Sequence, residues 1–151
     1  MSNPSWLFVI AAYIAVIGIF IAYKQLLATI EERINDNEIV TQGNFQKEMS
    51  RFFIKVPLIE IVPILLIIFG FIQLEDVQGT GQLSDIIIPF GFVLIVLVFG
   101  ITNVLLLRAR LVSIKDIDNQ SKPFINALSF IGISLLAAIP IVSFVAMYVF
   151  I

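Results

Sequence analysis

The sequence predicts an all-α membrane protein whose four transmembrane helices form two tandem helical hairpins. Of the 151 residues, 60% are hydrophobic and 13% are charged, and the mean hydropathy is +1.06. A water-soluble domain carries about a quarter charged residues. Four apolar runs are long enough to cross a bilayer, which takes about 20 residues in a helix. The polar connections between these runs alternate between basic and acidic.

The predicted spans are residues 6–30, 52–74, 86–107 and 124–151. The first contains Lys24 and Gln25, the second contains Lys55 and Glu60, and the other two carry no charge. The first run is too long for the apolar core of a signal peptide, so we expect it to be retained as a membrane helix. The chain then divides into a first hairpin (1–74), an external linker (75–85) and a second hairpin (86–151).

The distribution of basic residues predicts the orientation in the membrane. All nine Lys and Arg residues lie in or beside the first and third connections, whereas the linker between the hairpins has Glu75, Asp76 and Asp85 and no basic residue. Basic loops stay in the cytoplasm. We therefore expect a multi-pass protein of the cell membrane with both basic loops in the cytoplasm and both termini outside.

The composition excludes several function classes. The chain has no Cys and no His, which removes thiol chemistry, His-based triads and almost every zinc or transition-metal site. A net charge of -2 gives no basic face for nucleic acid. No pair of carboxylates is spaced for membrane-enzyme chemistry. We expect no cofactor, no metal site and no catalysis by this chain alone.

The second hairpin repeats the first. A shift of 77 residues takes FFIKVPLIEIVPI onto SFIGISLLAAIPI, so that Leu58 pairs with Leu135 and Pro63 with Pro140. Both hairpins have the same predicted orientation, which makes them parallel repeats. In this register Glu60 falls on Ala137. One hairpin therefore carries a carboxylate in the middle of the membrane and its twin does not.

Glu60 is the main candidate functional residue. A charge in the middle of a membrane helix costs at least ~2.5 kcal/mol, so such residues are functional candidates by default. A carboxyl group removed from water holds its proton more tightly, and one group of this kind is enough to carry protons. Pro63 lacks an N–H and leaves the carbonyl of Ile59 free as a nearby acceptor. An ordinary membrane-helix proline explains Pro63 equally well.

Depth in the membrane suggests which groups face Glu60. Tyr23, Lys24 and Gln25 are predicted to lie at about the same level. Gln25 or Tyr23 can bond the protonated acid, which leaves Glu60 free to titrate. An ion pair with Lys24, or with Lys55, would hold Glu60 ionised and make it structural. Both lysines are also long enough to reach toward the cytoplasm. A polar contact that only specifies the fold is the third alternative.

Small residues form one narrow stripe on the first span at Ala11, Ala15, Gly18 and Ala22. Stripes of this kind let membrane helices approach closely. Packing against the second span and packing against another copy of the chain are equally compatible with the stripe.

The second and fourth spans resemble the second helix of the rotary ATPase proteolipid, subunit c. In MSRFFIKVPLIEIVPILLIIFGFI the acid is followed three residues later by Pro, and SFIGISLLAAIPIVSFVAMYVFI is similar except for Ala137. V-type proteolipids likewise consist of two fused hairpins that share one carboxylate. The resemblance implies a homo-oligomeric ring in the lipid, with a-type stator and central-stalk subunits as partners. It makes Glu60 the proton-carrying residue. Ile61 offers no ligand oxygen, so we favour protons over sodium.

Departures from the family keep two other functions open. The first helices lack its dense glycine repeat, the loops lack its Arg-Gln-Pro turn, and the acid is in the second helix rather than the last. One alternative is a subunit c relative that is not part of a rotary ATPase and forms a structural or accessory membrane oligomer. A small proton-coupled transporter is the other, although parallel hairpins with external termini fit it poorly.

Overall fold

The computed structural model describes residues 3–76 and 82–149 and contains four long helices. They are α1 (Ser5–Asn35), α2 (Gln46–Glu75), α3 (Leu83–Val112) and α4 (Ser121–Val149), and no strand occurs among the described residues. Each helix is long and apolar enough to cross a membrane. The predicted all-α fold with four membrane helices is confirmed.

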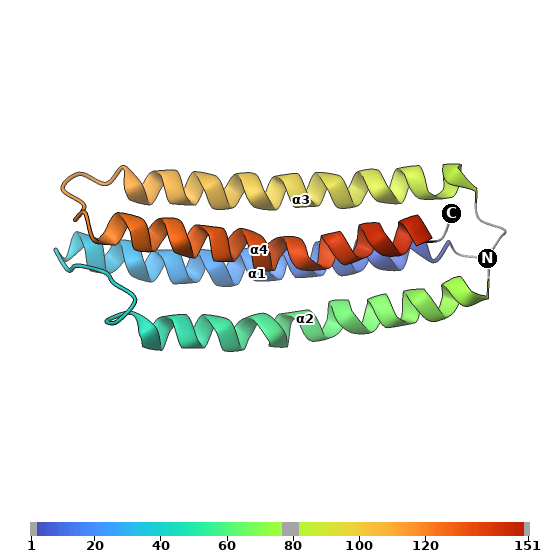
Figure 1. Ribbon diagram of the computed structural model, residues 1–151, viewed down its shortest axis with the longest axis horizontal. Coiled ribbons are helices and arrows are strands. Elements are labelled where there is room, and N and C mark those ends of the chain that lie inside the picture. Colours follow the sequence, from blue (N-terminus) through green and yellow to red (C-terminus); the bar gives the residue numbers. More distant parts are fainter. Residues whose placement is uncertain (1–2, 77–81, 150–151) are drawn as a thin grey trace.

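The helices are longer than the apolar runs that predicted them. They contain 29 to 31 residues, about 45 Å at 1.5 Å per residue, against a hydrocarbon core of about 30 Å. Figure 1 shows the two loops 36–45 and 113–120 at one end of the bundle, and the start of α1 and the end of α4 at the other. The backbone N–H of Val40 donates to the Ser121 hydroxyl at the loop end. All nine Lys and Arg residues lie on the loop side of the helix midpoints, so the basic residues gather in that half of the bundle.

Local capping sets two helix ends that hydropathy does not locate. Gln82 and Asp85 form a reciprocal capping box, which starts α3 at Leu83, inside the predicted linker 75–85. At the end of α1, Asn37 adopts a left-handed φ of 60°, and Asn37 and Glu38 donate to the last carbonyls of the helix. Linker residues 77–81 and the last two residues of the predicted fourth span lie outside the described part of the chain.

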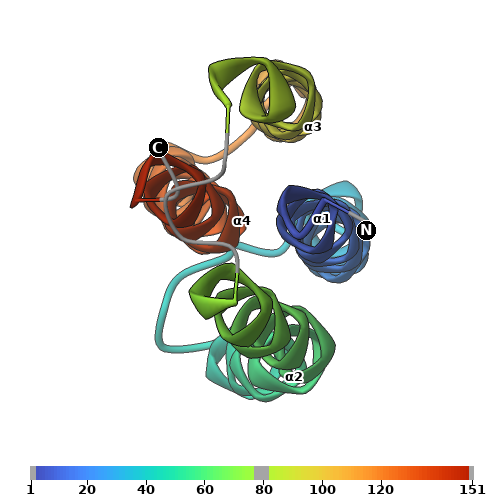
Figure 2. The same cartoon turned by 90° about the vertical axis from the view of Figure 1, so that its right-hand side faces the viewer.

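Helix α1 is the centre of the bundle. It packs against all three other helices, whereas α2 touches α4 only slightly and, within the described residues, does not touch α3. Figure 2 shows α1 and α4 in the middle, with α2 and α3 on opposite sides. The fully buried side chains of α1 include Phe8, Val16, Ile19 and Tyr23. By contrast, α2 and α3 present broad apolar faces to the surroundings, as helices in lipid do.

The two hairpins lie side by side in the same orientation. Viewed end-on, the direction from α1 to α2 is similar to the direction from α3 to α4 (Figure 2). Two pairs of positions that the 77-residue shift aligns around Glu60 match in burial. Pro63 and Pro140 are both buried, and Glu60 and Ala137 are both half-buried. The duplication of the hairpin stays a prediction of the sequence, and the two hairpins place these two pairs of residues in similar environments.

The stripe of small residues on α1 packs within the chain. A Cβ at Gly18 would lie 2.5 Å from Cγ2 of Ile59 on α2. Ala11, Ala15 and Ala22 are buried. At Gly18 the stripe therefore packs against α2 within the chain, and a contact of the stripe with another copy stays a prediction.

Candidate functional site

Glu60 lies in the middle of α2 on the flank of its buried face. That face includes Val56, Pro63 and Ile67, and Glu60 itself is half-buried. Within residues 3–76 and 82–149, its carboxylate takes part in no hydrogen bond and no ion pair. The group can therefore gain or release a proton without breaking a contact to another described side chain.

The two candidate lysine partners point elsewhere. Lys55 Nζ donates to Gln25 Oε1 at 3.0 Å. Five residues along a helix correspond to about 140° of rotation, so Lys55 and Glu60 occupy different flanks of α2. Lys24 is exposed and lines a cavity with Glu31 and Arg110, between α1 and α3. In the described part of the chain, neither lysine lies within 4.0 Å of the Glu60 carboxylate.

Tyr23 connects helices instead of reaching Glu60. Its hydroxyl donates to Ser129 Oγ on α4 at 2.9 Å, and the Ser129 hydroxyl donates to the Ile125 carbonyl at 2.8 Å. The Tyr23 ring meets Phe52 of α2 edge-on, with centroids 6.3 Å apart. Because Gln25 accepts from Lys55, the two supporting polar residues expected at Glu60 are both engaged in other contacts.

Pro63 and Ile59 shape α2 around Glu60. The helix continues through Pro57 and Pro63, and Figure 1 shows α2 changing direction near its middle. Pro63 has no N–H to offer the Ile59 carbonyl, which is therefore free of the usual helical bond. The Ile59 side chain packs against Gly18. This contact holds the segment that carries Glu60 close to α1.

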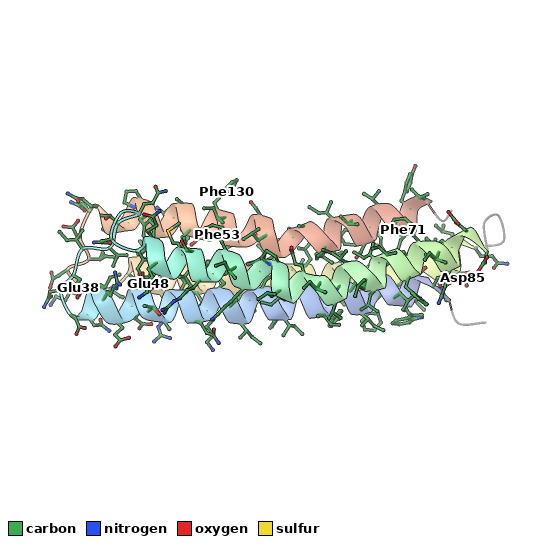
Figure 3. All side chains as sticks on the ribbon, turned by 90° about the horizontal axis from the view of Figure 1, so that it is seen from below. Glu38, Glu48, Phe53, Phe71, Asp85 and Phe130 are labelled. Carbon is green, nitrogen blue, oxygen red and sulfur yellow. The ribbon has the colours of Figure 1, made fainter. Side chains whose placement is uncertain are left out.

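Sequence reasoning missed a polar cluster at the loop end of the first hairpin. Arg33 pairs with Glu48, donates to the Asn44 carbonyl at 2.9 Å and stacks 5.0 Å from the centre of the Phe45 ring. A second carboxylate, Glu38, lies 3.9 Å away. Figure 3 shows Glu38 and Glu48 at one end of the bundle and Asp85 at the other. Arg33 and Glu48 are nearly equidistant from the centre of the loop, and that symmetry could have predicted their pairing.

No metal-ion site is formed in the described part of the chain, because no three carboxylates gather there. Nothing matches this chain among protein-family models, curated proteins or solved structures. The chemistry of the site therefore rests on its own geometry. It offers one carboxyl group, set in a membrane-spanning helix and half-buried at its side.

Proposed function

We propose that this protein is a membrane proton carrier of the subunit c type, and that Glu60 is the group that carries the proton. The observation that carries the proposal is the position of Glu60. It is half-buried in the middle of α2, and no described basic side chain lies within ion-pair distance of it. A carboxylate that a lysine neutralises is fixed in one charge state, whereas this one is not.

The energetics favour a cycle of two charge states. A charge at the bilayer centre costs at least ~2.5 kcal/mol, so Glu60 faces lipid in its protonated, neutral form. Release of the proton needs water or a cation at the exposed flank of α2. In the proposed assembly an a-type stator subunit provides that surface, and the central stalk contacts the loop end.

The arrangement of the hairpins supports a ring of copies. Helices α1 and α3 pack closely, whereas α2 and α4 barely touch. Further copies of the chain, packed against this one as its two hairpins pack against each other, would form a curved array. Helices α1 and α3 would lie on the inner side of the array and α2 and α4 on the outer side (Figure 2). Repeated head-to-tail contacts of this type close into rings when the rotation allows it. Glu60 would then belong to the outer layer of helices.

Protons fit the site better than sodium. A sodium ion needs several oxygen ligands, and the residue after the acid, Ile61, supplies none. The amide oxygen of Gln25 already accepts from Lys55. A lone carboxyl group is sufficient for one proton.

A non-rotary relative that forms a structural membrane oligomer is the second candidate. It is favoured by the loop end, where Arg33, Glu48 and Phe45 hold the first loop against α1 and α2. In such a protein Glu60 would be a polar contact between copies and would not titrate in the working range.

Labelling with a hydrophobic carbodiimide separates the two candidates, because the reagent reacts with protonated carboxyl groups in lipid. In native membranes we expect Glu60 to be labelled, and faster at low pH. Glu60→Gln should abolish the label, whereas Glu48→Gln, at the loop end, should leave it intact. Absence of labelling in the unaltered chain at every pH would contradict proton carriage. Co-purification with stator and stalk subunits then tests the rotary assembly.

A further inference from the structure

Two cavities join along one side of the α1/α2 hairpin. The first, about 140 Å³, is polar and lies toward the loop end, where Gln25, Thr29, Glu48, Arg51, Phe52 and Lys55 line it. The second, about 330 Å³, continues from it toward the middle of the bundle and is lined by Gly18, Ile21, Leu58 and Ile59. Ala22, Gln25 and Lys55 border both. The two cavities therefore adjoin, and together they are here called the hairpin groove.

The polar end of the groove carries an excess of positive charge. Within the described residues, Arg51 has no hydrogen-bond or ion-pair partner, and Lys55 bonds only the neutral Gln25. The one carboxylate on the lining, Glu48, is paired with Arg33. Two cationic side chains, one helical turn apart, are therefore available to bind an anion. A phosphate group accepts from both Arg and Lys.

The other end of the groove is apolar and shaped for a chain. Its floor is formed by Gly18 and Ala22, the two residues of the small stripe nearest the loop end, and its walls are Ile21, Leu58 and Ile59. Ile21 is 50% exposed and Leu58 is 62% exposed, so neither is covered by another part of the protein. A slot of this kind, open to the bilayer, fits a single acyl chain.

The position of the groove along the helices matches a lipid of the cytoplasmic leaflet. Arg51 and Lys55 stand where the charged first turns of α2 give way to its apolar run. That is the level of the headgroups, where basic side chains meet the phosphates of anionic lipids. The positive-inside distribution assigns this end to the cytoplasm. The polar end of the groove therefore lies at the depth of a phospholipid headgroup, and its apolar end lies at the depth of the acyl chains.

We propose that the hairpin groove binds one anionic phospholipid of the cytoplasmic leaflet. Its phosphate group lies against Arg51 and Lys55, and one acyl chain lies along Gly18, Ile21 and Leu58. The proposal does not rest on proton carriage by Glu60, because none of its contacts involves that residue.

Retention of lipid by the purified full-length chain tests the proposal. The protein is equilibrated in micelles with equal amounts of phosphatidylglycerol and phosphatidylcholine, and bound lipid is counted by native mass spectrometry. We expect one phosphatidylglycerol per chain. Arg51→Gln with Lys55→Gln should reduce its retention about 25-fold, since each of the two basic contacts contributes on the order of fivefold. Lys115→Gln with Lys122→Gln removes the same charge at the same end, outside the groove, and should have little effect.

A second pair of variants tests the acyl slot without changing charge. Ile21→Trp fills the groove and should lower retention, whereas Ile17→Trp, one turn away on α1 and outside the groove, should not. Equal retention by Arg51→Gln/Lys55→Gln and the unaltered chain would overturn the proposal. So would equal losses in both charge variants, or equal retention of phosphatidylcholine. Cross-linking of the Ile21→Cys variant to a second copy of the chain would identify that copy as the occupant instead.

Discussion

Gly18 of α1 lies directly against Ile59 of α2, the residue that precedes Glu60. A Cβ at Gly18 would stand 2.5 Å from Ile59 Cγ2. Small residues permit close approach where no hydrophobic effect drives helices together. The missing side chain of Gly18 therefore sets the distance between α1 and the segment that carries the candidate carboxyl group.

Gly18→Ala should destabilise the bundle by about 1–3 kcal/mol, the usual cost of overpacking. Alanine gains about 1 kcal/mol over glycine in helix propensity, but Ile59 is β-branched and its χ1 is stiff, so it cannot move aside easily. Unfolding of the purified protein in mixed micelles of a mild detergent and dodecyl sulfate measures the change.

Gly91→Ala is the matched control, because a Cβ at Gly91 on α3 meets nothing within 4 Å. It should leave the free energy of unfolding unchanged or raise it slightly. Ile59→Ala added to Gly18→Ala should recover part of the loss. An equal loss in the two glycine variants would show that helix packing at Gly18 is not the cause.

Tyr23→Phe should cost about 0.5–1.5 kcal/mol, because it removes the hydrogen bond to Ser129 and leaves the packing of the ring intact. Ser129→Ala should cost a similar amount, and the double variant should cost less than the two together. Tyr148→Phe, at a side chain that is 77% exposed, should be neutral. Additive losses at Tyr23 and Ser129 would contradict the contact.

The same variant also tests whether Tyr23 serves Glu60. Since the Tyr23 hydroxyl bonds Ser129 on α4, Tyr23→Phe should leave the pH profile of carbodiimide labelling unchanged. A shifted profile would instead support the sequence-based expectation that Tyr23 bonds the protonated acid. Labelling at a series of pH values, for the variant and the unaltered chain in parallel, distinguishes these outcomes.

Arg33→Ala should destabilise the loop end by about 1–3 kcal/mol, through loss of the charge-assisted bond to Glu48 and the cation–π contact with Phe45. The pair is mostly shielded, with 26% and 20% of the two side chains exposed. Glu38 stands 3.9 Å from Arg33 and is 59% exposed, so Glu38→Gln should change stability by less than about 0.5 kcal/mol. Equal effects of the two substitutions in the unfolding assay would argue against a specific cluster.

Hydropathy predicted the four helices because a span in lipid must satisfy its backbone internally and present apolar side chains. The surroundings of Glu60 were not predictable in the same way. Depth places Tyr23, Lys24 and Gln25 at about one level, but consecutive residues point about 100° apart. In the structure they diverge, with Tyr23 turned to α4, Lys24 to the side of α3 and Gln25 to Lys55. Direction around the helix depends on packing that no single span encodes.

The helix ends mark another limit of hydropathy. The third apolar run starts at Ile86, yet α3 begins at Leu83, because the Gln82–Asp85 box satisfies the first turn. The residues of the box are visible in the sequence. What is not visible is that they cap this helix rather than continue the linker.

The repeat predicts that the carboxyl group can be moved from one hairpin to the other. Ala137 of α4 takes the position of Glu60, is half-buried like it, and is followed three residues later by the buried Pro140. In a chain carrying Glu60→Gln, Ala137→Glu should therefore restore carbodiimide labelling with the pH profile of the unaltered protein. Ala138→Glu is the control, because this neighbour is exposed and points to a different side of α4. If the acids at 137 and 138 show the same profile, the environment at Glu60 is ordinary lipid and the two hairpins do not share a functional position.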